Sequence, residues 1–329
     1  MLAVKRLEKT FGLIRAVRDV SFQVAQGEVL GFLGPNGAGK TTTMRMITGF
    51  LPPTAGTAII MGHDIIHEPI SAKKLIGYLP ENAPVYADMT VWNYLGFIAE
   101  IRGFIGRVRV ERVQQTIETC RLDTVKHQAI GTLSKGYKQR VCFAQTLLHD
   151  PPVLIMDEPT DGLDPNQKHI VRTMIRNMAA RKAIVISTHI LEEVEAICTR
   201  VIIIRDGSIV ANASPTELKA KSRAHGAVEL TVKSAPGDLV AKLERLTSAA
   251  RVEVYPPQAA PKATGVQMPR VVVYPRPSAA GAAIAAGPAQ LATDILALVK
   301  ANPGWDLAAM KTLEGRLDDV FRELTESKN

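Results

Sequence analysis

The stretch that decides the fold is the nine-residue run Gly34-Pro35-Asn36-Gly37-Ala38-Gly39-Lys40-Thr41-Thr42, which directly follows the apolar residues 29–33. It matches the pattern G-x-x-x-x-G-K-S/T, in which glycines let the backbone turn back and point successive N–H groups at an anion. Lys40 is then placed to reach the β- and γ-phosphates of a nucleotide, and the Thr41 hydroxyl to ligate Mg²⁺. A Gly-rich turn is the alternative, but the complete motif between a strand and a helix favours a nucleoside triphosphate site.

Composition limits the remaining possibilities. The chain has 329 residues, 46% of them hydrophobic, which suits one large and one smaller domain. The net charge is +8, but Lys and Arg are scattered along the chain, so we expect no nucleic-acid partner. Three widely spaced cysteines predict reduced thiols. No apolar run approaches the ~20 residues of a membrane-spanning helix, and no signal-peptide pattern is present, so we expect that the chain does not cross a bilayer by itself.

Polar residues follow two further buried strands. Asp157 and Glu158 come after the apolar residues 153–156, and His189 follows the strand predicted at 183–187. Carboxylates at the C-terminal edge of a parallel sheet, beside a phosphate loop, suit the handling of magnesium and an attacking water. Asp157 is therefore predicted to hold Mg²⁺, Glu158 to polarise the water and His189 to contact the γ-phosphate. Ordinary polar strand ends and a structural histidine are the alternatives.

Two other positions allow two interpretations each. Ser134 is a good N-cap for a helix with an apolar face at Val141, Ala144 and Leu148. The free N–H groups of that helix could bind an anion, although an ordinary capped helix is favoured on these residues alone. Phe11 lies in a polar turn, where it could stack on a purine base or be a core residue at a strand end.

In their order along the chain, these motifs resemble the nucleotide-binding subunit of an ATP-binding-cassette (ABC) transporter. The correspondence comprises the phosphate loop at 34–42, the signature at 133–137, the Walker B strand at 153–158, the D-loop at 161–164 and the switch histidine His189. It covers roughly residues 1–220. The resemblance implies an α/β fold, a P-loop NTPase cassette with a parallel-sheet core, and residues 90–126 read as its helical insertion.

The resemblance also implies a mechanism in which two cassettes close head to tail over two ATP molecules. Ser134 and Gly136 of one cassette would contact the γ-phosphate held by Lys40 of the other, in a homodimer or a pairing with a second cassette. The implied ligands are ATP and Mg²⁺, with Glu81 at the glutamine-loop position as a further oxygen ligand beside Thr41 and Asp157. The signature departs from the usual L-S-G-G-Q, since it reads Leu133-Ser134-Lys135-Gly136-Tyr137.

Residues 221–329 lie outside the cassette and predict a small α+β C-terminal domain. A similar extension occurs in cassettes of bacterial exporters of the gliding-motility, multidrug and copper-maturation types. The chain is thus expected to be an ATP-hydrolysing subunit bound peripherally to a polytopic permease at the cytoplasmic face of the inner membrane. The alternative is a soluble ABC ATPase acting on nucleic acid or ribosomes, but the usual second cassette or long insertions of that class are missing from this sequence.

Overall fold

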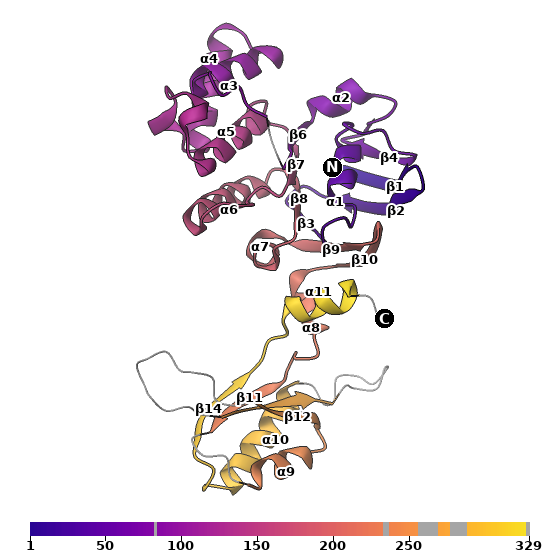
Figure 1. Cartoon of the computed structure of the whole chain (residues 1–329), viewed down its shortest axis with the longest axis vertical. Helices are drawn as coiled ribbons and strands as arrows, with labels where there is room; N and C mark the ends of the chain where they lie inside the picture. The colour runs from indigo at the N-terminus through magenta and orange to yellow at the C-terminus, as the bar shows by residue number, and fades with distance from the viewer. Residues whose placement is uncertain (82–83, 233–236, 256–268, 277–287, 327–329) are drawn as a thin grey trace. The chain divides into compact units, whose positions relative to one another are not determined.

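The computed structural model describes residues 1–81, 84–232, 237–255, 269–276 and 288–326 (Figure 1). Its contacts divide the chain into two compact units, which are Met1–Pro215 together with the residues from Leu324 onward, and Thr216–Glu323. Among the described residues, no helix is both long and apolar enough to span a bilayer.

The first unit is built on a six-stranded sheet in the order β10-β9-β3-β8-β7-β6. Five of its strands run parallel, and β10 pairs with β9 in the antiparallel sense. The strands are β3 (Val29–Leu33), β6 (Ile76–Leu79), β7 (Val153–Asp157), β8 (Ala183–Thr188), β9 (Arg200–Arg205) and β10 (Ser208–Ala213). Every residue of β3, β7 and β8 is buried, as expected for parallel strands covered on both faces.

Alternate residues of this sheet belong to two separate cores. Val153 and Ile155 of β7 pack into one cluster, while Leu154 and Met156 pack into the other. Because successive side chains of a strand point to opposite faces, the sheet separates the two cores. Figure 1 shows the corresponding arrangement, with helices α3 to α6 on one side of the sheet and α1 with a second sheet on the other.

The first core is formed with a small antiparallel sheet in the order β2-β1-β4-β5. The strands of this sheet are β1 (Leu2–Phe11), β2 (Ile14–Val24), β4 (Ala55–Ile60) and β5 (His63–Asp64). The helices on the same side are α1 (Lys40–Ile47) and α2 (Pro69–Lys74). Phe22 of β2 and Phe32 of β3 meet here, with ring centroids 5.6 Å apart. Helix α1, which follows the phosphate loop, is therefore held between two sheets.

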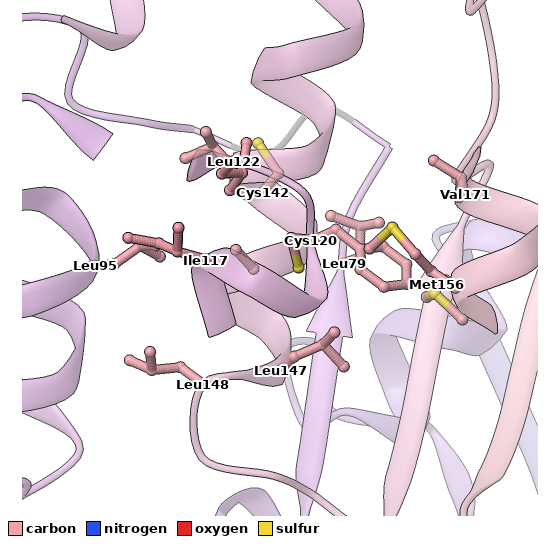
Figure 2. Packing of buried hydrophobic residues seen from close by; sticks show 14 of the residues in the cluster. Leu79, Leu95, Ile117, Cys120, Leu122, Cys142, Leu147, Leu148, Met156 and Val171 are labelled. Atoms are coloured by element: carbon pink, nitrogen blue, oxygen red, sulfur yellow. The ribbon is translucent and has the colours of Figure 1, made fainter. Parts of the chain in front are cut away.

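The second core lies under the helices, and Figure 2 shows part of it. The elements on this side are α3 (Val91–Ile101), α4 (Gly106–Thr119), η1 (Asp123–Val125), η2 (Ile130–Thr132), α5 (Lys135–Leu147), α6 (Pro165–Ala179) and α7 (Leu191–Ile197). The predicted helical insertion is confirmed as α3 and α4, separated where Gly103 takes a φ of +85°. Ser134 is confirmed as the N-cap of α5, since its side chain accepts a hydrogen bond from the Tyr137 amide. Val141, Ala144 and Leu148 are buried, as predicted.

The second unit contains an antiparallel sheet in the order β12-β13-β11-β14. The remaining elements lie wholly or mostly in this unit and are α8 (Pro215–Ala220), β11 (Val228–Val232), α9 (Leu239–Glu244), β12 (Ala249–Tyr255), β13 (Arg270–Pro275), α10 (Pro288–Ala301), β14 (Leu307–Thr312) and α11 (Leu317–Thr325). Leu239 and Leu243 of α9, with Leu291 and Ile295 of α10, share one core with the sheet. Both helices therefore cover the same face, an α+β arrangement.

We predict that Phe32→Ala destabilises the first unit by about 3–5 kcal/mol, because Phe32 is fully buried and the substitution leaves a cavity. Urea unfolding followed by tryptophan fluorescence and circular dichroism measures the change. The matched control is Leu13→Ala, since Leu13 is fully exposed and should change stability by less than about 0.5 kcal/mol. A loss below about 1 kcal/mol for Phe32→Ala would contradict the packing described here.

Candidate active site

The phosphate loop connects β3 to α1, and its glycines are required by close backbone contacts. A Cβ at Gly39, which has a φ of +103°, would lie 2.5 Å from the Ala16 carbonyl oxygen. A Cβ at Gly34 would lie 2.5 Å from the Ile204 carbonyl oxygen. Any larger residue at either position would displace the loop from the strands that support it. Gly37 has a φ of +81°, which also favours glycine.

Lys40 is the first residue of α1 and is folded back over the loop. Its Nζ donates hydrogen bonds to the carbonyl oxygens of Gly34 at 2.8 Å and Pro35 at 3.3 Å. The side chain is buried, and Nζ lies 3.8 Å from Glu158 Oε1. Burial lowers the pKa of Lys40 below its ordinary value, and nearby carboxylates, Glu158 foremost, partly oppose this shift. The ammonium is therefore held beside the loop by acceptors that an anion could replace.

Asp157 ends β7, where strand register places it directly opposite Ser187 of β8. One carboxylate oxygen of Asp157 accepts a hydrogen bond from Ser187 Oγ. The other, Oδ2, is buried and has no hydrogen-bond partner among the described residues. Such an oxygen suits Mg²⁺, which proteins commonly hold through one or two carboxylates and the phosphates of a substrate. Within the described ranges, no cluster of three or more His, Cys, Asp or Glu side chains could hold a metal by itself.

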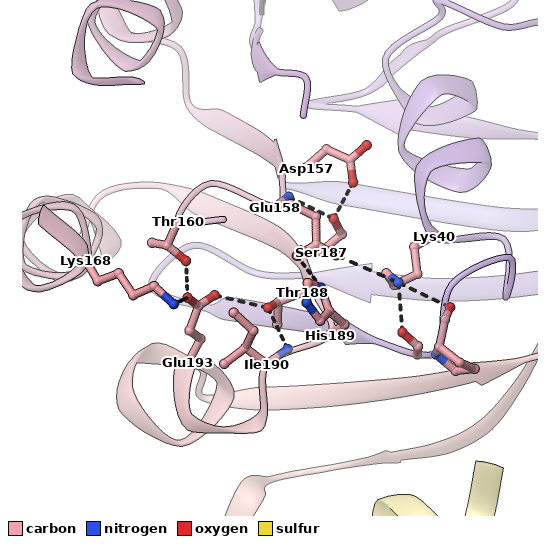
Figure 3. A network of polar contacts seen from close by, with 12 residues as sticks. Lys40, Asp157, Glu158, Thr160, Lys168, Ser187, Thr188, His189, Ile190 and Glu193 are labelled. Carbon is pink, nitrogen blue, oxygen red and sulfur yellow. Dashed lines mark hydrogen bonds and ion pairs between the residues drawn. The ribbon is translucent and has the colours of Figure 1, made fainter. Parts of the chain in front are cut away.

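Glu158 has a backbone conformation that L-residues seldom adopt. Its φ is +49°, and its amide N–H points to the Ser187 carbonyl oxygen at 3.2 Å and to Ser187 Oγ at 3.1 Å. A non-glycine residue in this region costs about 1–3 kcal/mol, and such strain persists only where the surroundings enforce it. Here it turns the Glu158 side chain toward Lys40 and His189 (Figure 3).

The Glu158 carboxylate lies between two basic groups. Oε2 is 3.1 Å from Nδ1 of His189, and Oε1 is 3.8 Å from Nζ of Lys40. Burial raises the pKa of Glu158 above its ordinary value, while His189 and Lys40 act against that shift. The structure thus brings together four of the residues selected from the sequence: Lys40, Asp157, Glu158 and His189.

The other predicted site residues differ in exposure, and His189 itself is exposed. Thr41 and Thr42 are half-buried in the first turn of α1, and Pro35 and Asn36 are exposed on the loop, whereas Ala38 is buried. Glu81 is exposed, and its charge raises the pKa of Lys40 to a smaller extent than the charges of Glu158 and Asp157 do.

Phe11 is 47% exposed at the end of β1, so the alternative that it is a core residue is wrong. The ammonium of Lys9 lies over its ring, 5.1 Å from the centroid. Stacking of Phe11 on a base stays a prediction.

Ser134 and Gly136 are separated from Lys40 of the same chain. They begin α5, whose buried side chains belong to the core on one face of the six-stranded sheet, whereas those of α1 belong to the other core. Gly136 is buried against α6, where a Cβ would lie 2.7 Å from Cγ of Gln167. The side chain of Lys135 extends to Gly162 in the predicted D-loop.

Comparison with known proteins agrees with this geometry. The sequence profile of the family described as ABC transporter matches residues 17–161. The uncharacterized ABC transporter ATP-binding protein YxlF of Bacillus subtilis is 38% identical over 223 residues, which are 68% of this chain and 74% of that protein. The chain belongs to the ABC transporter ATP-binding proteins.

Two further similarities cover a comparable share of this ABC protein. The Nod factor export ATP-binding protein I of Paraburkholderia xenovorans is 37% identical over 226 residues, 68% of this chain and 74% of that protein. A solved ATP-binding subunit of an ABC transporter superposes with a TM-score of 0.62 at 30% identity, covering 67% of this chain and 92% of that one. Several longer relatives match as well, and the chain spans only 27% to 38% of their length.

For this ABC protein, the predicted α/β cassette fold is confirmed, and ATP hydrolysis is characteristic of its family. Sequence reasoning missed the polar residues behind the site, namely Ser187, Thr160, Thr188 and Glu193. The polar run Ser187-Thr188 at the end of an otherwise apolar strand was a signal for two of them.

We predict that Glu158→Gln raises the thermal midpoint of the nucleotide-free protein more at pH 8 than at pH 5. Since the pKa of Glu158 is raised on folding, its contribution to stability is greatest below its unfolded pKa of about 4.3 and is lost as pH rises through the folded value. Glutamine has no such loss. Differential scanning fluorimetry at both pH values measures the difference.

The control for this experiment is Glu192→Gln. Arg172 lowers the pKa of the exposed Glu192 through a hydrogen bond and its charge, so that removal of this carboxylate should not raise the midpoint at either pH. Equal midpoint changes at pH 8 and pH 5 for Glu158→Gln would contradict the prediction.

Proposed function

We propose that this chain binds ATP with Mg²⁺ at the phosphate loop, hydrolyses it with Glu158 as general base, and thereby energises export through a membrane permease. The observation that carries the proposal is the position of the Glu158 carboxylate between Lys40 and His189, at the edge of the sheet where the phosphate loop begins. The backbone conformation of Glu158 supports it as well, because it turns the carboxylate toward Lys40 and His189.

ATP binding would use groups that the loop already presents. The Lys40 ammonium would exchange the carbonyl oxygens of Gly34 and Pro35 for the β- and γ-phosphates, while the loop amides and the N-terminus of α1 receive the remaining charge. The free oxygen of Asp157, with Thr41 and Glu81, would hold Mg²⁺, which neutralises charge on the phosphates when bound. Phe11 would stack on the adenine.

Hydrolysis requires a base that accepts a proton from the attacking water. A carboxylate serves this purpose better as its pKa approaches the working pH, and burial shifts the pKa of Glu158 in that direction. His189, 3.1 Å from the carboxylate, would fix its orientation and contact the γ-phosphate. Asp157 stays bound to Ser187 and so leaves the proton transfer to Glu158.

A second cassette would complete the site. Ser134 and Gly136 lie at the start of α5, which packs on the face of the sheet opposite α1, so we propose that they reach the γ-phosphate held by another copy or a second cassette. We further propose that residues 1–220 act as the ATPase unit and residues 221–329 as an accessory domain. The permease would be polytopic, and the chain would bind it at the cytoplasmic face of the inner membrane. The Nod factor export relative supports the direction of transport.

Lys40→Ala should lower ATP affinity at least ~10²-fold, because the loop keeps its amides but loses the cation that faces the β- and γ-phosphates. Isothermal titration calorimetry with ATP and Mg²⁺ measures the affinity. Lys5→Ala is the matched control, since Lys5 is an exposed lysine on β1. This variant should bind ATP with the affinity of the unchanged protein. Equal affinity for Lys40→Ala and Lys5→Ala would refute the role of the loop.

Glu158→Gln should retain ATP affinity within about threefold and reduce the hydrolysis rate at least ~10²-fold, the scale expected for a lost general base. With turnover blocked, ATP should also cause dimerisation, which size-exclusion chromatography with light scattering detects. A hydrolysis rate within tenfold of the unchanged protein would exclude Glu158 as the base. A monomer at saturating ATP would count against the two-cassette site but leave the base assignment intact.

A further inference from the structure

A buried carboxylate lies directly behind the candidate active site. Glu193, in α7, is only 2% exposed, which is rare for a glutamate without bonded partners. Its Oε1 accepts a hydrogen bond from Thr160 Oγ1, and its Oε2 accepts one from Thr188 Oγ1 at 3.0 Å (Figure 3). Both threonines are completely enclosed, so neither hydroxyl has water as an alternative partner.

The two threonines belong to the two segments that carry Glu158 and His189. Thr160 is two residues beyond Glu158, and Thr188 immediately precedes His189. One carboxylate therefore connects segments that are 28 residues apart in the sequence, since Thr160 and Thr188 differ by that number. A displacement of either segment would change the 3.1 Å separation of Glu158 and His189.

The direction of these hydrogen bonds is determined by the charge of Glu193. An ionised carboxylate only accepts, so the Thr188 hydroxyl has to donate its proton to Glu193. Its lone pairs are then available to the Ile190 amide, which donates to the same oxygen at 3.0 Å. The resulting turn over residues 188–190 fixes the backbone on both sides of His189.

The same carboxylate supports the strained backbone at Glu158. Ser187 holds the Glu158 amide on one side, and Thr160 is held by Glu193 on the other. A left-handed conformation of a glutamate persists only when its neighbours over-determine it. The contact of Ser187 on one side of Glu158 and that of Glu193 on the other supply this condition.

Two cations compensate for the buried charge without bonding directly to it. Lys168 Nζ and Arg172 Nη2, both on α6, lie 3.9 Å and 4.0 Å from Glu193 Oε1. At these separations, both cations balance the carboxylate charge, while the hydroxyls of the two threonines make the directional contacts. The orientation of the two hydroxyls therefore depends on Glu193 itself.

We propose that Glu193 is a positioning residue for hydrolysis, which aligns Glu158 and His189 through the hydroxyls of Thr160 and Thr188. The inference rests on the proposed roles of Glu158 and His189. Glu193 reaches neither of them directly, so its effect should fall on turnover and leave nucleotide affinity unchanged.

The experiment compares hydroxyl-retaining and hydroxyl-removing variants in the full chain. Thr188→Val and Thr160→Val preserve shape but not the donor, whereas Thr188→Ser and Thr160→Ser preserve the donor. Glu193→Gln preserves shape and one acceptor oxygen. We expect the Val variants and Glu193→Gln to lower kcat about 10- to 100-fold, the scale of a misplaced catalytic group, with the affinity for ATP within twofold. The Ser variants should stay within about threefold of the unchanged kcat.

Coupling between these residues provides a second measurement. Because all three act as one unit, Thr188→Val combined with Glu193→Gln should lower kcat little further than Glu193→Gln alone. Glu118→Gln is the control, since Glu118 is an exposed glutamate on α4 and should leave kcat within twofold. If Glu193→Gln does not fold, the Ser and Val pairs decide the question.

Three results would overturn the proposal: kcat within twofold in the Val variants, equal losses in the Ser and Val variants, or a loss of ATP affinity that parallels the loss of kcat. The last would indicate a purely structural role. Failure of the proposed function is a distinct outcome, since it would appear as retained hydrolysis in Glu158→Gln whatever the Glu193 variants do.

Discussion

The candidate site depends on one interaction, the buried carboxylate of Glu158 held between the ammonium of Lys40 and the imidazole of His189. Each group comes from a different strand end or loop, so their meeting requires the complete parallel sheet. Burial lowers the pKa of Lys40 and raises that of Glu158, because the charged form of each group is less stable there than in water. The anion that enters beside Lys40 would replace backbone carbonyls, not water.

The sheet produces this meeting through register. Strands β3, β7 and β8 are buried along their whole length, and their polar continuations emerge at the same edge. Ser187 opposite Asp157 then serves both acidic positions, donating its hydroxyl proton to Asp157 and accepting the Glu158 amide. A fully apolar sheet interior thus ends in a polar layer, with Asp157 keeping one unpaired oxygen.

Helices α5 and α7 hold the segment that follows Glu158 through side-chain hydrogen bonds. The side chain of Gln139 in α5 donates a hydrogen bond to the Pro159 carbonyl at 3.0 Å, directly after Glu158. Thr160, the residue after Pro159, donates a hydrogen bond to Glu193 in α7. The segment that follows Glu158 is therefore attached to both helices, and a rearrangement at the start of α5 has a short physical route to the Glu158 carboxylate. This attachment gives the proposed contact between cassettes a way to influence hydrolysis.

Local patterns in the sequence determine much of this protein. The glycines of the loop, the apolar runs of β3, β7 and β8, and the cap of α5 by Ser134 all depend on residues close in sequence, so short-range rules predict them. Family resemblance added the roles of Glu81 and Gly136, which remain proposals. Only the tertiary structure decided that Phe11 is exposed, that Glu158 is left-handed, and that Glu193 binds Thr160 and Thr188. The reason is that the conformation of a buried polar residue is decided by partners from distant segments, such as Ser187 for Glu158, and no local pattern in the sequence records them.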